Sequence, residues 1–237
     1  MIATGKSGDG SQVTEVIDLE NEENICHHSL NFPLEVSGAI GFQNGYHWPI
    51  ICGGDCEDLS IKKECFDLAT SEKVADMQIA RRYSSSISYK DGGFVFGGYG
   101  YGDGYESSVE MFQNSSNAWP FTFKRRLPVT VQFACAIKWK EEAWIIGGTQ
   151  NGPLDRSNQT WRASLPRLDN WTKGPQMRYA REEHGCGVIA NHGLLVVFGG
   201  YSDGSETTEV LNFSENTFEL GTDMLKIKGS LNSLTAK

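Results

Sequence analysis

Short apolar runs that each end in a pair of glycines recur along the chain. Four such runs, "PIIC", "FVF", "AWII" and "LLVVF", lead into the doublets Gly53-Gly54, Gly97-Gly98, Gly147-Gly148 and Gly199-Gly200. A degenerate fifth copy, "MIATGK", carries Gly5 followed by Lys6. Apolar runs of this length bounded by glycine predict buried β-strands, and the glycines mark backbone that needs a positive φ or a close neighbour.

A second apolar segment follows each doublet and contains a glutamate in most copies. The segments "TEVIDL", "ECFDL", "VEMFQ" and "TEVLNF" place it at Glu15, Glu64, Glu110 and Glu209. In the remaining copy, "TWRASL", Trp161 stands where the glutamate is expected. Nine or ten residues further on, a bulky aromatic residue follows at Trp119, Trp171 and Phe218. The pattern predicts two more strands after each doublet.

Small residues dominate the segments upstream of the doublets, at 83–89, 129–137 and 183–190. Small side chains suit the crowded innermost strand of a propeller blade, where all blades converge. The first glycines, at positions 5, 53, 97, 147 and 199, are 48, 44, 50 and 52 residues apart, and this spacing is typical of propeller repeats. The sequence therefore predicts four-stranded antiparallel units at about 1–25, 36–76, 80–123, 128–173 and 180–220, with a tail at 221–237.

Composition narrows the class of protein. The 237 residues are 39% hydrophobic and contain no apolar run long enough to span a bilayer, so we expect one globular domain without membrane insertion. The N-terminal segment lacks the basic and apolar regions of a signal peptide. A net charge of −9 argues against nucleic acid as a partner. The basic cluster Lys124, Arg125 and Arg126 is interpreted as a solvated turn.

Taken together, the apolar runs with glycine doublets, the glutamate segments and the trailing tryptophans resemble the kelch repeat over nearly the whole chain. Arg181-x-x-His184 resembles the kelch first-strand entry. The resemblance implies a single all-β domain at residues 1–237, a kelch-type β-propeller that binds proteins or other ligands without catalysis. The alternatives it leaves open are a galactose-oxidase-like or other propeller enzyme, and the substrate-recognition part of a BTB-kelch ubiquitin-ligase adaptor.

Blade number is left open by the sequence. Kelch propellers commonly have six blades, whereas this chain shows about five repeats and begins in the middle of a unit. Either the tail at 221–237 supplies the closing strand of a five-bladed ring, or the chain is a fragment and the ring is incomplete. A fragment is favoured, because an unclosed ring exposes sheet edges that natural propellers avoid.

Six cysteines leave the redox state open. Cys52 and Cys65 lie on strands expected to pair, so a disulfide between them is expected, with Cys56 as a competitor and Cys26 as a further partner. The segment "CHHSLNFP" followed by "CGG" resembles invertebrate kelch proteins of secreted type, which favours an extracellular location over a cytoplasmic one. Cys135 and Cys186, at equivalent inner-strand positions, are expected to be reduced and buried. In the alternative, a cytosolic propeller, all six cysteines are reduced.

Glycosylation acceptors form a mild excess over chance. They lie at Asn114, Asn158, Asn170 and Asn212. The segments containing Asn170 and Asn212 are predicted strands, where access for a glycan is expected to be poor.

No catalytic residue, metal site or cofactor is predicted. The histidines are scattered over different units, at His27, His28, His47, His184 and His192. They cannot be matched to the copper ligands of a kelch-type oxidase. Zinc coordination by His27, His28 and the nearby cysteines lacks a CxxC pair of zinc-ribbon spacing. His184 is expected to be a strand-entry residue bonded to backbone.

A partner-binding face is predicted on the loops that follow the doublets, together with the segments that enter the first strands. Tyrosine and arginine on anchored loops are typical of binding surfaces. The candidate residues are Tyr99, Tyr101, Asp103, Tyr105, Arg156, Tyr201 and Asp203, with Arg81, Arg82 and Arg181 behind them. Ion pairing of the arginines with loop acids such as Glu182 or Asp203 is the alternative. We expect this face to contact a protein or peptide. The turns at the opposite end, "KDGG", "KWKEE" and "NHG", are short and polar and have little area to bury.

Overall fold

The computed structural model describes residues 2–6, 12–17, 26–27, 38–44, 47–56, 60–101, 104–113, 121–152 and 155–221. Throughout this part of the chain the protein is all-β, and its one helical element is a 3₁₀ turn at Ala190–His192. None of the described helices is long and apolar enough to cross a bilayer.

Four of the sheets are four-stranded antiparallel meanders. The first contains β4 (Ile40–Asn44), β5 (His47–Cys52), β6 (Glu64–Asp67) and β7 (Lys73–Asp76). The second contains β8 (Ser85–Tyr89), β9 (Gly92–Phe96), β10 (Ser108–Gln113) and β11 (Phe121–Arg126). The third contains β13 (Cys135–Trp139), β14 (Glu142–Ile146), β16 (Thr160–Ser164) and β17 (Thr172–Lys173). The fourth contains β18 (Gly185–Ile189), β19 (Leu194–Phe198), β20 (Thr208–Asn212) and β21 (Thr217–Leu220).

Two smaller sheets complete the description. One contains β1 (Ile2–Lys6), β2 (Gln12–Ile17) and β3 (Cys26–His27), and the other pairs β12 (Val131–Gln132) with β15 (Thr149–Gln150). The closing strand predicted in the tail lies outside the described residues, apart from Gly221.

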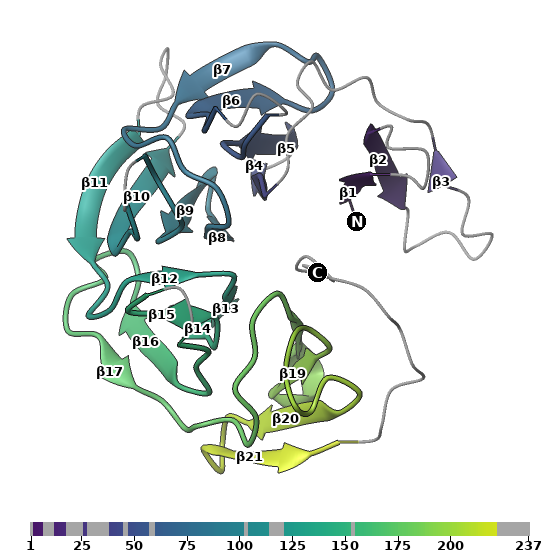
Figure 1. Ribbon diagram of the computed structural model, residues 1–237, viewed down its shortest axis with the longest axis vertical. Helices are drawn as coiled ribbons and strands as arrows, with labels where there is room; N and C mark the ends of the chain where they lie inside the picture. The colour runs from purple at the N-terminus through teal and green to yellow at the C-terminus, as the bar shows by residue number, and fades with distance from the viewer. Residues whose placement is uncertain are drawn as a thin grey trace.

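The four-stranded sheets lie around a common centre, with their first strands innermost and their fourth strands at the periphery (Figure 1). β8 packs against β4 on one side and β13 on the other, and β13 packs against β18. The described sheets form an arc that does not close into a ring.

A series of backbone hydrogen bonds joins the sheets near this centre. The amide of Tyr83 donates to the carbonyl of Gly38 at 2.9 Å, Phe133 donates to Tyr83 at 3.0 Å, and Glu183 donates to Phe133 at 3.0 Å. All four residues have positive φ, between 53° and 65°. Each sheet therefore meets the next through the same backbone position, which we call the central hydrogen-bond series.

The glycine doublets make a second set of contacts between sheets. The amides of Gly54, Gly98 and Gly148 donate to the carbonyls of Arg81, Val131 and Arg181, at 2.9, 2.7 and 2.8 Å. Gly97 has a φ of +60°, and a Cβ atom added there would lie 2.2 Å from the Val131 oxygen. The doublets end the second strands because the next sheet's entry segment occupies the space that a side chain would need.

The hydrophobic core lies between neighbouring sheets. One cluster joins Phe42 and Ile50 of the first sheet to Phe112 of the second, and the Phe42 and Phe112 ring centroids are 5.3 Å apart. The other clusters lie between the second and third sheets and between the third and fourth. Full burial of each large apolar side chain stabilises the fold by about 1.5–3 kcal/mol.

The strand register corrects one sequence alignment. Glu110 lies opposite Val95, Glu209 opposite Val197 and Trp161 opposite Ile145, so these three occupy equivalent positions. In the first sheet, however, Cys52 lies opposite Cys65 and Ile51 opposite Phe66. Phe66 therefore takes the glutamate position, and the prediction that Glu64 is equivalent to Glu110 is wrong by two residues.

Candidate binding face

The loops after the glycine doublets are pinned to the segments that enter the same sheets. In the second sheet, Arg82 and Tyr99 exchange backbone hydrogen bonds of 3.0 and 2.8 Å. In the fourth sheet, Glu182 and Tyr201 do the same at 3.3 and 2.8 Å. Strands β12 and β15 are the equivalent pairing in the third sheet. Each loop thus begins from a fixed backbone position. We call the surface formed by these loops and entry segments the loop face.

Two tyrosines project from the loop face into solvent. Tyr101 is 67% exposed and Tyr201 is 57% exposed. Tyr99 and Tyr105 instead pack edge to face, with ring centroids 5.3 Å apart, and a backbone bridge joins them. The packed pair stabilises the base of the loop from which Tyr101 projects.

Arg82 links the first and second sheets at this face. Its guanidinium donates to the Asp55 carboxylate in the loop after β5. The same guanidinium lies 4.9 Å from the Tyr83 ring centroid and 5.3 Å from that of Tyr99. Arg82 is therefore engaged in an ion pair whose two side chains are mostly buried, and a partner that binds its guanidinium would have to compete with Asp55.

Arg156 links the third and fourth sheets in a similar way. Its Nε donates to Glu182 Oε1 at 2.9 Å, and Glu182 Oε2 accepts a hydrogen bond from Thr149. The Arg156 side chain is still 47% exposed. Asp155 and Asp203 are exposed on these loops, so the loop face presents aromatic rings, the partly exposed Arg156 guanidinium and carboxylates.

Tyr83 and Phe133 are neighbours in the central hydrogen-bond series, and their side chains also meet. Their ring centroids are 4.3 Å apart. Burial raises the pKa of the Tyr83 phenol, the carboxylates of Asp55 and Glu183 raise it further, and Arg82 opposes them. Tyr83 is therefore a neutral phenol at physiological pH.

Arg81 and Arg181, which the sequence analysis places behind the loop face, are buried inside the second and fourth sheets. Arg81 Nη2 lies 2.5 Å from Glu110 Oε1, and Arg181 Nε lies 3.1 Å from Glu209 Oε1. Because neither guanidinium reaches solvent, the expectation that these two arginines contact a partner is wrong. The loop acids Glu182 and Asp203 are not the partners of Arg181.

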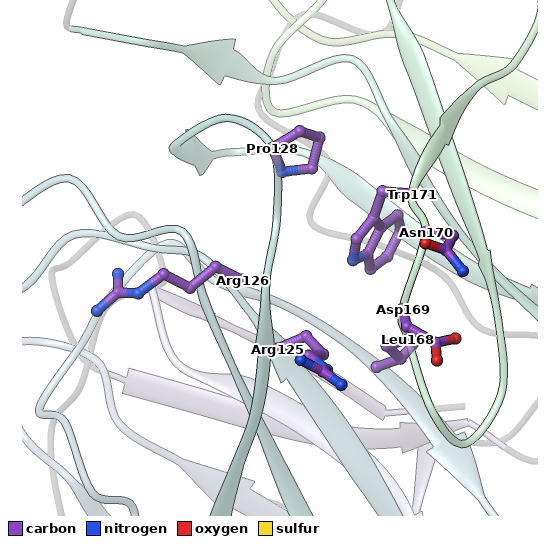
Figure 2. A pocket seen from close by; sticks show the side chains of 7 residues that line it. All are labelled: Arg125, Arg126, Pro128, Leu168, Asp169, Asn170 and Trp171. Atoms are coloured by element: carbon purple, nitrogen blue, oxygen red, sulfur yellow. The ribbon is translucent and has the colours of Figure 1, made fainter.

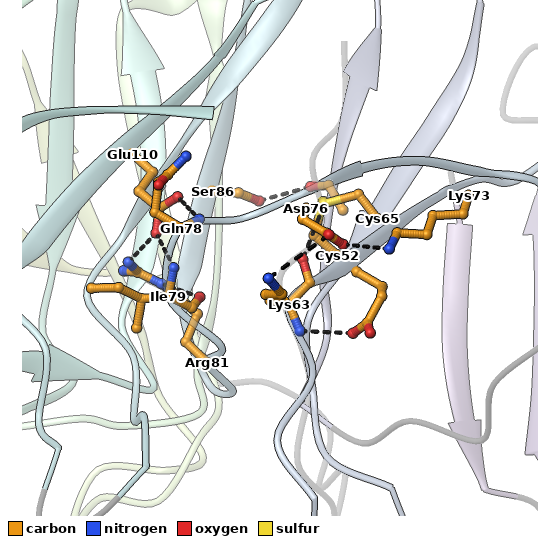
Figure 3. Close-up of a disulfide and its surroundings, with 12 residues drawn as sticks. Cys52, Lys63, Cys65, Lys73, Asp76, Gln78, Ile79, Arg81, Ser86 and Glu110 are labelled. Atoms are coloured by element: carbon orange, nitrogen blue, oxygen red, sulfur yellow. Dashed lines mark hydrogen bonds and ion pairs between the residues drawn. A yellow bond between two sulfur atoms is a disulfide. The ribbon is translucent and has the colours of Figure 1, made fainter. Parts of the chain in front are cut away.

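The two buried pairs repeat the same hydrogen bonds. Arg81 also donates to the Gly97 carbonyl at 2.7 Å, and Glu110 accepts from the amides of Gln78 and Ile79 (Figure 3). In the fourth sheet, Arg181 donates to the carbonyl of Gly199 at 3.0 Å, and Glu209 accepts from the amides of Arg178 and Tyr179. Each pair ties the entry segment to the third strand and the doublet of its own sheet. We call these the Arg–Glu clamps.

The third sheet replaces the clamp with other residues. Val131 takes the arginine position, 50 residues from both Arg81 and Arg181, and Trp161 takes the glutamate position. The buried amide of Gln150 donates to the Gly147 carbonyl at 3.0 Å, and the Trp161 indole N–H donates to Gln150 at 3.4 Å. Two repeats contain both the arginine and the glutamate, and the third contains neither. This joint presence or absence is the sequence signal that could have revealed the clamps.

Two disulfides lie within the described part of the chain. Cys52 and Cys65 are joined as predicted, across β5 and β6, with Cα atoms 4.1 Å apart (Figure 3). Cys135 and Cys186 are also joined, with Cα atoms 6.1 Å apart, and this bond links the inner strands of the third and fourth sheets. The expectation that Cys135 and Cys186 are reduced is therefore wrong. Cys56, the predicted competitor, belongs to neither disulfide.

His184 is fully buried between the third and fourth sheets. Burial and the neighbouring charge of Arg181 lower its pKa to about 3, so its imidazole is neutral at physiological pH. Across the part of the chain described, no three His, Cys, Asp or Glu side chains are grouped as metal ligands. Asp103 lies outside the described residues.

Comparison with protein-family models gives no match, and no curated protein matches the sequence.

Proposed function

We propose that this protein is a non-enzymatic kelch-type β-propeller scaffold, and that it binds a protein or peptide through the loop face. The observation that carries the proposal is the pair of exposed tyrosines, Tyr101 and Tyr201, on loops whose bases are fixed by backbone pairing. Large aromatic rings held in place lose little entropy on binding, and such residues dominate the energetics of protein interfaces.

The repeated architecture supports the propeller part of the proposal. Four-stranded meanders follow one another with their first strands facing a common centre (Figure 1). The central hydrogen-bond series recurs after 45, 50 and 50 residues, at the spacing of a propeller repeat.

Charged side chains on the loop face would form a polar rim around the exposed tyrosines. Arg156 retains exposed surface while paired with Glu182, and Asp203 is exposed on the neighbouring loop. Aromatic anchors with a charged rim are the usual anatomy of a specific interface. We therefore place Tyr101 and Tyr201 at the centre of the contact, with Tyr105 supporting Tyr101 from below, and the charged residues at its edge.

Selection from a random peptide library displayed on phage, against the chain with its disulfides intact, tests the proposal. Selected peptides are then measured against Tyr101→Ala, Tyr201→Ala and Arg156→Ala. We expect a central tyrosine variant to lose about 30-fold in affinity, which corresponds to about 2 kcal/mol. Thermal stability should change little, because the side chains removed are exposed.

Lys140→Ala and Glu141→Ala, in the exposed turn between β13 and β14, are the matched controls. They lie at the opposite ends of the strands from the glycine doublet. If the control variants lower the affinity for the selected peptides more than the Tyr101 and Arg156 variants do, the binding face has been wrongly assigned.

A further inference from the structure

The turn between β16 and β17 carries an accessible glycosylation sequence, Asn170-Trp171-Thr172. Asn170 and Thr172 are both exposed, and Asn170 has a φ of +56°. β17 begins only at Thr172, so the expectation that Asn170 lies within a strand is wrong. The asparagine is instead in a bend two residues before β17.

The other described acceptor sequences are less accessible. The side-chain nitrogen of Asn158, to which a glycan would be attached, donates to the Met177 carbonyl at 2.9 Å in a partly buried position. Asn212 is within β20, paired with both β19 and β21, and its side-chain oxygen accepts two hydrogen bonds from Ser214. Asn114 lies outside the described residues.

Space beside Asn170 is open at the periphery of the arc. A cavity of about 470 Å³ lies between the end of β11 and this turn, with Arg125, Pro128 and Trp171 among its lining residues. Asn170 also lines this cavity, and Figure 2 shows it beside Trp171 on the turn that borders it. Because Asn170 is exposed at the edge of this open space, a sugar attached to it has room beside the turn.

The disulfides indicate that the chain folds in an oxidising compartment, where N-glycosylation also takes place. Cys52–Cys65 and Cys135–Cys186 are both buried bonds, the second joining two sheets. Disulfides of this structural kind form in the oxidising secretory compartments, where asparagine-linked glycans are also added.

We propose that Asn170 is an N-glycosylation site of this protein. The co-reactant is a lipid-linked oligosaccharide with N-acetylglucosamine at its reducing end. Asn170 Nδ2 loses a proton and bonds to the anomeric carbon of that sugar. The bond between the anomeric carbon and the pyrophosphate oxygen breaks, and the lipid pyrophosphate leaves with its electron pair.

The site also leaves the loop face clear. β16 starts beside the glycine doublet, where Thr160 lies opposite Ile146, and ends with Ser164 opposite Glu142. The Asn170 turn follows this far end of the strand. A glycan there covers the periphery between the second and third sheets and does not block Tyr101 or Tyr201.

Expression behind a cleavable signal peptide in animal cells tests the proposal. Protein is collected from the medium and from the membrane-enclosed fraction, so that a retained chain is also scored. Release of glycans with peptide N-glycosidase in ¹⁸O water converts each glycosylated asparagine to labelled aspartate, which peptide mass spectrometry locates. We expect label at Asn170 and none at Asn158 or Asn212.

Thr172→Ala and Thr172→Ser are the matched variants, because they alter the acceptor sequence without altering Asn170. Thr172→Ala should remove the label at Asn170 and the mass of one glycan, and Thr172→Ser should retain both. Unlabelled Asn170 in disulfide-bonded protein, or label at Asn158 or Asn212 in its place, would overturn the proposal.

Discussion

Arg81 and Glu110 form an ion pair, 2.5 Å apart, in which neither side chain has any exposed surface. Burial lowers the pKa of Arg81, while the carboxylate of Glu110 opposes that change. A buried charge that loses its partner keeps its desolvation penalty. We expect Arg81→Met to lower the free energy of unfolding by about 3–5 kcal/mol, measured by urea denaturation.

A double-mutant cycle separates the pair from the surrounding packing. Arg81→Met with Glu110→Met should cost clearly less than the two single changes added together, because no unpaired charge remains. Arg156→Met, which breaks the partly exposed pair with Glu182, should cost at most about 1 kcal/mol. Additive effects at Arg81 and Glu110 would show that the clamp contributes only packing.

The two disulfides should differ in their contribution to stability, because they close loops of different length. Their partners are separated by 51 residues in Cys135–Cys186 and by 13 in Cys52–Cys65. Loop-closure entropy predicts losses of about 4 and about 3 kcal/mol for the respective double alanine variants. Guanidinium denaturation of both variants checks the order, and a larger loss for the shorter loop would contradict it.

His184 should make the fold sensitive to acid. The folded pKa is about 3 and the ordinary value is 6.5, so between these pH values the unfolded chain binds the proton and the folded chain does not. The contribution to stability is complete above about pH 6.5 and falls by about 1.4 kcal/mol per pH unit as pH drops toward 3. In His184→Gln, the urea midpoint of unfolding should depend less on pH across this range. The exposed His192→Gln is the control and should keep the wild-type slope.

Gly97 should tolerate no side chain. An added Cβ meets the Val131 carbonyl at 2.2 Å, and φ is +60°. We expect Gly97→Ala to destabilise the protein by about 3 kcal/mol, from the strained backbone and the displaced entry segment. Gly41→Ala is the control, because its nearest contact is 3.6 Å. Equal thermal shifts for the two variants would argue against this close approach.

Local patterns predicted much of the fold, and contacts between sheets account for most of what they missed. The doublet at Gly97 and the small residues of β8 mark strands by composition alone. The Cys52–Cys65 bond joins adjacent strands of one meander, so its geometry follows from the pattern. The Cys135–Cys186 bond depends on how two sheets meet, and no local pattern encodes that distance.

The burial of Arg81 was missed for a related reason. Arginine is usually exposed, so a surface role is the default expectation for it. Its buried position depends on Glu110, 29 residues away, on a strand that only the folded sheet brings close. The exposed Tyr101 needed no such partner, and its loop position was enough to place it on the surface.

The central hydrogen-bond series does not depend on which side chains occupy its positions. Gly38, Tyr83, Phe133 and Glu183 range from a glycine to aromatic rings and a carboxylate, yet all have positive φ and are linked by the same kind of backbone hydrogen bond. At this point the sheets are joined through peptide groups, which every residue except proline possesses in full. Mutations at these positions can therefore remove the sequence similarity between repeats, while the backbone hydrogen bond that joins one sheet to the next is kept.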